Sequence, residues 1–344
     1  MVYEGAKNET AEEIKNVFHF PDNKTILRNS FEELYLEINN DSDKKYELHT
    51  ANTLWIQNDF KILEEYISVI KRYYHGEARN LNFASDPEGS RKIINEWVYE
   101  QTNHTIEELI PPSSIDESTR LVITNAIYFN GKWASSFDKS NTRLDDFWIS
   151  PNRSIKVPMM RQTNYFNYVE FKNMQVLEMP YAGNKLSMII LLPKGCNESD
   201  LKDVEKSLTA DNISMIRASF PEEYKDKTRA IIPKFKFVKS YELRRALSEM
   251  GISKAFSPFF ADFSGITGDR SLYISKILHK AFIDVNEEGT KASAATAVNI
   301  GYGCPAPDLT QPKLFKADHP FVFIIQDRVS GAILFMGRVS NPAE

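Results

Sequence analysis

A segment near the C-terminal end of the chain reads NEEGTKASAATAVNI over residues 286–300. Every second side chain from Thr290 onward is small or apolar and carries no charge: Thr290, Ala292, Ala294, Thr296, Val298 and Ile300. The side chains between them are Lys291, Ser293, Ala295, Ala297 and Asn299. Because successive side chains of a strand point to opposite faces, this segment could bury its uncharged face in a sheet and turn Lys291 and Asn299 outward.

The neighbouring residues favour a loop instead. From residue 286 to 314 there is no helical stripe, and the segment continues with GYGCPAP at 301–307. Loops this long inside a compact domain are uncommon and are usually functional or disordered. A flexible small-residue linker or an ordinary edge strand would explain the composition as well, and composition alone favours these simpler interpretations.

The chain as a whole predicts one domain, residues 1–344, because 42% of its residues are hydrophobic and no Pro/Gly/Ser-rich linker divides it. The formal net charge of -5, with scattered Lys and Arg, argues against a nucleic-acid or polyanion partner. No stretch reaches the ~18 apolar residues of a membrane span, so we expect no membrane partner. We expect a monomer.

Residues that could form a catalytic or metal centre are scattered. Cys196 and Cys304 lack the spacing of a metal or redox pair, and they do not fix the compartment. No metal-binding spacing links the histidines His19, His49, His75, His104 and His319. Dinucleotide, phosphate-loop and nucleophile-elbow motifs are missing as well. The sequence therefore predicts no catalytic centre, no metal and no cofactor.

Helical and strand-like segments alternate irregularly, which predicts an α+β fold. Helices are expected from a capping box at Thr10-Ala11-Glu12-Glu13, over 27–38, over 86–106 with Asp86 as N-cap, and over 240–250 with Gly251 as C-cap. Strands are expected at 48–56, 121–129, 186–192, 272–285, 320–325 and 332–339. Residues 327–331 form a hairpin-length connection between the last two.

Several long motifs, in a fixed order, resemble the serpin family over nearly the whole chain. They are NEEGTKASAAT at 286–296, SKILHKAF at 275–282, DHPF at 318–321, LFMGRVSNP at 334–342, TNAIYFNGKW at 124–133, NEWV at 95–98 and DFSGI at 262–266. The resemblance implies three β-sheets, about eight or nine helices and an exposed reactive-centre loop at about residues 287–312. Relative to the family, the first helix and most of the second are missing, so we expect either upstream sequence or a truncated form. A signal peptide upstream would make the protein extracellular.

The resemblance also implies a mechanism. A serine protease, or a cysteine protease in some cases, attacks the loop and forms an acyl-enzyme. The hinge then inserts as a new strand between the strand ending near Phe129 and the one ending near Glu288, and the protease is trapped. The hinge residues are Glu287, Glu288, Gly289, Thr290, Lys291, Ala292, Ser293, Ala294, Ala295 and Thr296. Such a protein is a suicide substrate with a metastable fold, not an enzyme.

Counting sixteen residues from Glu287, as is usual in inhibitory serpins, places the reactive bond at Gly303-Cys304. A shift of one residue gives Tyr302-Gly303. Glycine suits an elastase-like or subtilisin-like protease, and tyrosine suits a chymotrypsin-like one. No Arg or Lys lies between Ala292 and Gln311, which argues against a trypsin-like target.

Three further residues match family positions that control opening of the sheet. His279 and Asn125 match a pair that hydrogen-bonds beneath the opening point, and Trp133 matches a tryptophan where the loop first inserts. Without the resemblance, the first two are a buried polar pair and Trp133 is a core residue. Two alternatives to an inhibitor stay open: a non-inhibitory serpin acting as a carrier or chaperone-like protein, and a hydrolase with an unrecognised site.

Overall fold

The computed structural model describes residues 1–39, 45–221, 227–290 and 311–344. Their contacts divide them into two compact units. Unit 1 is built from the described residues of Met1–Ser42, Leu48–Tyr128 and Val238–Phe282. Unit 2 is built from those of Asp43–Glu47, Phe129–Phe237 and Ile283–Glu344.

Unit 1 combines helices with most of a six-stranded sheet. Its helices are α1 (Val2–Gly5), α2 (Asn8–Phe18), α3 (Lys24–Asn39), α4 (Glu64–Tyr74), α5 (Pro87–Gln101), α8 (Arg244–Met250) and α9 (Ser264–Thr267), with a 3-10 turn η2 (Lys254–Phe256). The sheet contains β1 (Tyr46–Gln57), β2 (Glu77–Leu81), β3 (Leu121–Lys132), β10 (Phe235–Glu242), β11 (Lys276–Asn286) and β12 (Gly289–Thr290), in the order β10-β11-β12-β3-β1-β2.

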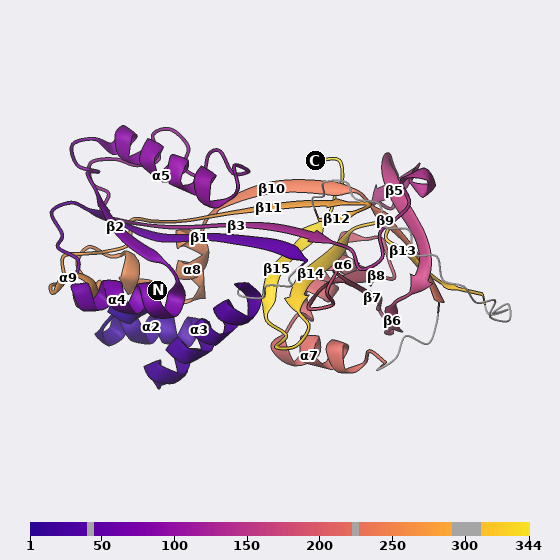
Figure 1. Cartoon of the computed structure of the whole chain (residues 1–344), viewed down its shortest axis with the longest axis horizontal. Coiled ribbons are helices and arrows are strands. Elements are labelled where there is room, and N and C mark those ends of the chain that lie inside the picture. The colour runs from indigo at the N-terminus through magenta and orange to yellow at the C-terminus, as the bar shows by residue number, and fades with distance from the viewer. Residues whose placement is uncertain (40–44, 222–226, 291–310) are drawn as a thin grey trace. The chain divides into compact units, whose positions relative to one another are not determined.

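The sheet in unit 1 is apolar on both faces, and each face has its own helices. Along β1, Leu54 and Ile56 pack with α4 in one core cluster, whereas Trp55 packs with Trp97 of α5 in another. This division follows from the alternation of side chains along a strand. Figure 1 accordingly shows α5 on one face of these strands and α2 and α4 on the other.

Unit 2 contains two further sheets. One has the order β13-β9-β5-β4 and is built from β4 (Arg143–Ser150), β5 (Arg153–Tyr165), β9 (Lys227–Pro233) and β13 (Lys313–Lys316). The other has the order β15-β14-β8-β7-β6 and is built from β6 (Asn167–Glu170), β7 (Met174–Pro180), β8 (Leu186–Pro193), β14 (Phe321–Asp327) and β15 (Ile333–Val339). Helices α6 (Glu198–Lys206) and α7 (Ala210–Ala218) pack on the second sheet, and a 3-10 turn η1 (Lys139–Asn141) precedes β4.

The described residues contain the nine helices α1–α9 and three sheets, which confirms the predicted α+β class. Two predicted helix signals are also confirmed. Asp86 caps α5 by accepting from Gly89 N at 2.8 Å, and Gly251 ends α8 in the left-handed region with φ of 118°. The connection at 327–331 joins β14 to β15 as expected, and Asp327 accepts from Ser330 N and Val329 N.

Several predicted boundaries are wrong. The capping box at residues 10–13 does not form, because α2 already begins at Asn8 and the Thr10 hydroxyl accepts from Asp262 N instead. Helix α5 ends at Gln101, not at residue 106, and β11 begins only at Lys276. Residues 240–242 belong to β10, so α8 is shorter than predicted. Helical periodicity did not separate a strand from the helix that follows it.

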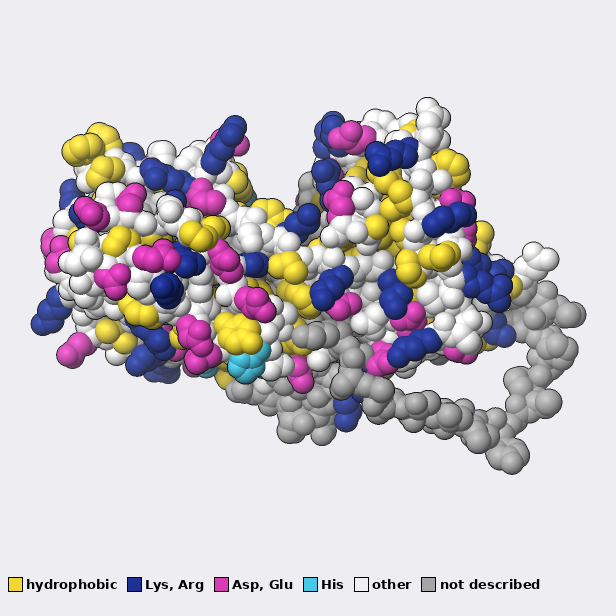
Figure 2. Space-filling model, turned by 90° about the horizontal axis from the view of Figure 1, so that it is seen from above, with side chains coloured by type: hydrophobic (Ala, Val, Ile, Leu, Met, Phe, Trp, Pro, Cys, Tyr) yellow, Lys and Arg dark blue, Asp and Glu magenta, His cyan; other side chains and the backbone are white. Residues whose placement is uncertain are grey.

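The surface drawn in Figure 2 carries basic and acidic side chains interspersed with each other, in keeping with the small net charge. No helix in the described part of the chain is long and apolar enough to cross a membrane.

Candidate functional site

The start of the hinge forms a sharp turn in unit 2. Strand β11 ends at Asn286, and β12 returns at Gly289 after the turn at Glu287 and Glu288. Gly289 has φ of 148°, and a Cβ atom there would lie 2.0 Å from the carbonyl oxygen of Gly131. Only glycine combines this backbone conformation with such a close approach. Glycine at position 289 therefore fixes where β12 begins.

Strand β12 lies between β3 and β11 in the sheet order. It pairs antiparallel with both: Thr290 is opposite Val285 of β11 and opposite Gly131 of β3. Further along, β3 and β11 pair directly with each other, in parallel, from Val122–Lys276 to Tyr128–Phe282. The hinge thus begins as a strand between two strands that otherwise pair with each other.

The side chain of Thr290 is fully buried and meets Tyr181, with the two hydroxyl oxygens 3.0 Å apart. Burial raises the pKa of Tyr181 above its usual range, so the phenol stays neutral. The ring of Tyr181 stacks on Trp133, with ring centroids 4.6 Å apart and an interplanar angle of 13°. A charge on the side chain at position 290 would therefore be fully buried.

Trp133 holds the turn by its backbone as well as its ring. Its indole Nε1 donates to Asn286 O at 2.9 Å, and its own backbone N donates to Glu288 O at 2.9 Å. Phe137 N donates to Glu287 O at 2.8 Å. Three consecutive carbonyls of the turn are therefore satisfied by the segment that follows β3.

Glu287 is only 4% exposed and is held by two side chains. Lys234 Nζ lies 2.9 Å from Oε2, and Thr142 Oγ1 donates to Oε1 at 2.8 Å. Burial opposes ionisation, but Lys234, a backbone N–H and Thr142 outweigh it and hold the pKa of Glu287 below its ordinary value. By contrast, Glu288 pairs at 2.6 Å with Lys139, whose side chain is mostly exposed.

A row of side chains crosses four strands of unit 1: Asn52 of β1, Asn125 of β3, His279 of β11 and Tyr241 of β10. Asn125 Nδ2 donates to Asn52 Oδ1, and Asn125 Oδ1 bonds to His279 Nδ1. The ring of Tyr241 stacks on His279 with centroids 5.9 Å apart. His279 and Asn125 are register partners in the β3–β11 ladder. The row therefore joins the side chains of β3 and β11, which also pair through their backbones.

The hydrogen bonds assign the tautomer of His279. Because Asn125 uses its amide nitrogen on Asn52, its oxygen faces His279, and the proton of the imidazole must lie on Nδ1. Burial lowers the pKa of His279 below its ordinary value. At neutral pH the ring is thus uncharged and donates to Asn125.

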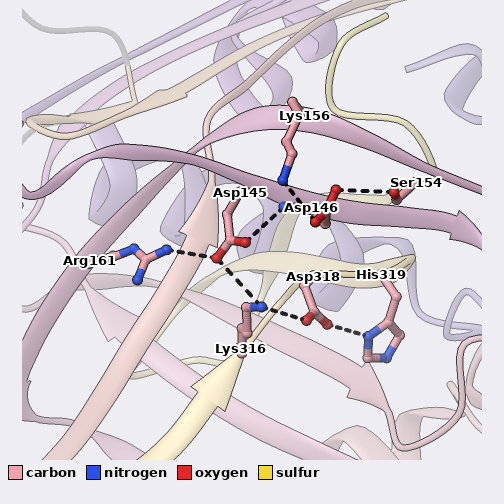
Figure 3. A network of polar contacts seen from close by, with 8 residues as sticks. All are labelled: Asp145, Asp146, Ser154, Lys156, Arg161, Lys316, Asp318 and His319. Atoms are coloured by element: carbon pink, nitrogen blue, oxygen red, sulfur yellow. Dashed lines mark hydrogen bonds and ion pairs between the residues drawn. The ribbon is translucent and has the colours of Figure 1, made fainter.

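A second polar network lies in the four-stranded sheet of unit 2 (Figure 3). Asp145 of β4 lies 2.7 Å from Arg161 Nη2 and 3.5 Å from Lys316 Nζ, and Lys316 also lies 3.0 Å from Asp318. His319 Nδ1 is 2.9 Å from Asp318, which completes the chain of contacts. Burial opposes ionisation of Asp145, yet the backbone N–H of the next residue, Lys316 and Arg161 hold its pKa low. The network ties β13 to β4 and β5.

The structure thus places the described site residues in two groups. Glu287, Glu288, Gly289, Thr290 and Trp133 are together in unit 2, and Asn125 and His279 are together in unit 1. The hinge residues from Lys291 to Thr296, and both candidate reactive bonds at Tyr302, Gly303 and Cys304, lie outside the described residues.

Sequence reasoning missed the partners Asn52, Tyr241, Tyr181, Thr142 and Lys234. Nothing in the local sequence pattern marks them. In the part of the chain that the structure describes, no group of three or more His, Cys, Asp or Glu could hold a metal.

The chain is similar to known proteins over nearly its whole length. A family model described as Serpin (serine protease inhibitor) matches residues 1–342. An uncharacterized serpin-like protein of Thermococcus kodakarensis is 43% identical over 344 residues, which are 100% of this chain and 78% of that protein. The leukocyte elastase inhibitor of Xenopus tropicalis is 37% identical over 99% of this chain and 89% of the inhibitor. Human thyroxine-binding globulin matches with a TM-score of 0.88 at 28% identity, over 100% of this chain and 88% of the globulin.

Proposed function

Because the chain belongs to the serpin family, whose members generally target proteases, we propose that it is a suicide-substrate inhibitor of a serine endopeptidase and not an enzyme. Cleavage of the loop releases the hinge, and the hinge inserts into the six-stranded sheet while the protease is still held as an acyl-enzyme. Loop insertion in serpins is itself a standard example of β-strand addition.

The observation that carries this proposal is the pairing of β12. Its two residues are antiparallel to both β3 and β11, and any continuation of the same strand would run between Val122–Tyr128 and Lys276–Phe282. Insertion would replace one parallel ladder by two antiparallel ladders, and antiparallel pairing is slightly more stable per residue. The small, uncharged face of residues 290–300 suits a strand that must be buried there.

The row through His279 and Asn125 supports a gating role for those two residues. Their hydrogen bond lies inside the ladder that insertion must open, and the row through Asn52 and Tyr241 holds four strands together. A gate of this kind delays insertion until the loop is cut. Trp133 supports the same step from the other end, because it binds the turn from which insertion starts.

For the reactive bond we propose Gly303-Cys304, with Tyr302-Gly303 as the alternative. The first suits an elastase-like or subtilisin-like protease, and the second a chymotrypsin-like one. The resemblance to the leukocyte elastase inhibitor favours the elastase-like target.

The test is incubation with an elastase, a subtilisin and a chymotrypsin, followed by denaturing gel electrophoresis and mass spectrometry of the released C-terminal peptide. We expect a complex that survives denaturation with at least one protease and a peptide beginning at Cys304 or Gly303. Complete turnover to cleaved protein with all three, and no complex, would contradict inhibition by these protease classes.

A non-inhibitory carrier is the second candidate. The similarity to thyroxine-binding globulin, whose name describes a protein that binds thyroxine, supports it. Thermal unfolding separates the two candidates. An inhibitor becomes markedly more stable after its loop is cut, whereas an unchanged melting temperature after cutting would favour the carrier.

A further inference from the structure

Three arginines surround a pocket of unit 2 that the proposed inhibition does not use. The pocket has a volume of about 280 Å³ and is lined by Asn141, Arg143, Arg161, Gln162, Thr163 and Arg229. The lining contains no acidic residue. The three guanidinium groups come from three neighbouring strands, β4, β5 and β9.

The sheet register places the arginines in a diagonal row on one face. Arg143 is opposite Met159, which is two residues before Arg161, and Arg229 is opposite Thr163, which is two residues after it. Because residues two apart in a strand share a face, Arg143 and Arg229 are the diagonal neighbours of Arg161 on its two sides. Diagonal neighbours in antiparallel sheets lie about 7–8 Å apart, so long side chains there can reach a common ligand.

The positive charge of this row is only partly neutralised. Arg161 pairs with Asp145 through Nη2, but its Nε is shielded from solvent and has no hydrogen-bond partner. Asp145 is itself shared with Lys316. Within the described residues, Arg143 and Arg229 are exposed and take part in no ion pair. Like charges on neighbouring strands repel each other, and a bound anion would relieve that repulsion.

We propose that this pocket, formed by Arg143, Arg161 and Arg229, binds a compact tetrahedral oxyanion, namely a phosphate or sulfate group of a small molecule. Guanidinium groups bind such oxyanions with two parallel hydrogen bonds, and three of them around one pocket offer more donors than a single carboxylate can accept. Thr163 and Asn141 also line the pocket, and their hydroxyl and amide groups add uncharged donors. A bound oxyanion would bridge β4, β5 and β9 and stabilise their sheet.

The test is titration calorimetry on the whole chain at fixed ionic strength, with glycerol phosphate, sulfate, acetate and chloride as probes. We expect saturable binding of glycerol phosphate or sulfate at one site per chain, and binding of acetate and chloride at least about tenfold weaker. The tighter of the two oxyanions identifies the ester. A phosphate monoester gains its second charge above about pH 6, so its affinity should rise across that pH while the affinity of sulfate stays constant.

Two variants and a matched control locate the site. Arg143→Gln and Arg229→Gln should each weaken oxyanion binding by about tenfold, since each removes one charge-assisted contact. Arg153→Gln makes the same charge change at an exposed position elsewhere on β5 and should leave the affinity within about twofold. Melting curves without the probe check that each variant is folded. Equal weakening by all three variants, or acetate binding as tightly as phosphate, would overturn the proposal.

Discussion

The hydroxyl oxygens of Thr290 and Tyr181 lie 3.0 Å apart, and both side chains are completely shielded from solvent. Thr290 is the last hinge residue that the structure describes, and it already occupies a buried position between β3 and β11. The side chain at 290 is therefore accommodated in the sheet before any cleavage of the loop.

Thr290→Arg should convert the proposed inhibitor into a substrate. The arginine cannot be buried without a partner, at a cost of several kcal/mol, so β12 would be expelled and insertion would slow. The measurement is the ratio of covalent complex to cleaved protein after reaction with the target protease. Thr290→Val is the control, because it keeps the shape without charge and should still form the complex. Equal amounts of complex from Thr290→Arg and wild type would refute this role.

Gly289→Ala should destabilise the hinge more than an ordinary glycine replacement does. Its φ is positive and its Cβ would meet backbone atoms of Gly131 and Lys132, so we expect a loss of about 2 kcal/mol or more. Gly268→Ala is the control: φ there is 91°, but nothing lies within 4 Å of the added Cβ, so about 1 kcal/mol is expected. Chemical denaturation of both variants measures the difference. The same loss in both would show that the close approach is unimportant.

Lys234→Met should weaken the anchor of the hinge. It leaves the carboxylate of Glu287 buried without its cation, and because Lys234 is partly exposed we expect a loss of about 1–3 kcal/mol, less than for a fully buried pair. Lys139→Met removes the exposed partner of Glu288 and should cost clearly less stability than Lys234→Met. Because the folded pKa of Glu287 is lowered, its stabilisation is present above the unfolded pKa of about 4.3 and is lost as the pH falls through the folded value. The melting temperatures of Lys234→Met and wild type should therefore converge at acid pH. A difference between them that stayed constant with pH would argue against the ion pair of Lys234 and Glu287.

Acidification should destabilise unit 1 through His279. Burial lowers the pKa of His279 in the folded protein. Below the unfolded pKa of about 6.5, the unfolded chain therefore binds a proton that the folded chain does not, and the protein becomes less stable as the pH is lowered. His279→Gln keeps an amide donor for Asn125 and should flatten the fall in melting temperature below that pH. An unchanged pH profile in His279→Gln would exclude this histidine as the cause.

Asp145→Asn should loosen the sheet that contains β13. Asp145 lies between Arg161 and Lys316, so neutralising it leaves two cations facing each other, and we expect a loss of about 1–2 kcal/mol. Asp146→Asn is the neighbouring control, since its partner Lys156 is well exposed and losing this pair should cost less stability than losing the contacts of Asp145. Urea unfolding of both variants provides the comparison. If Asp146→Asn cost as much, the network in Figure 3 would have no special role.

The sequence predicted those features that depend on short patterns. Asp86 and Gly251 act as caps because capping chemistry is local, and β3 and β11 are recognisable from apolar runs of strand length. The motifs also brought His279 and Asn125 together correctly, although they are 154 residues apart. Family resemblance supplied that pairing, since no local pattern encodes it.

The partners that the sequence did not predict share one property: their role depends on a contact distant in the chain. Tyr181 meets Thr290 across 109 residues, and Lys234 reaches Glu287 from the end of β9. Thr10 was misassigned for the same reason, because its hydroxyl binds the backbone at Asp262 instead of capping its own helix. Tertiary contacts overrode local propensity in each case.

The position of β14 has a consequence for biosynthesis. Strand β14 pairs with β8 on one side and β15 on the other, although residues 194–320 separate β8 from β14 in the chain. Every residue of β8, Leu186–Pro193, is buried in the finished sheet. Until the ribosome has made β14, one edge of the apolar strand β8 has no partner strand, and such an edge favours aggregation. Nascent chains of this protein should therefore depend on chaperones until β14 has been made.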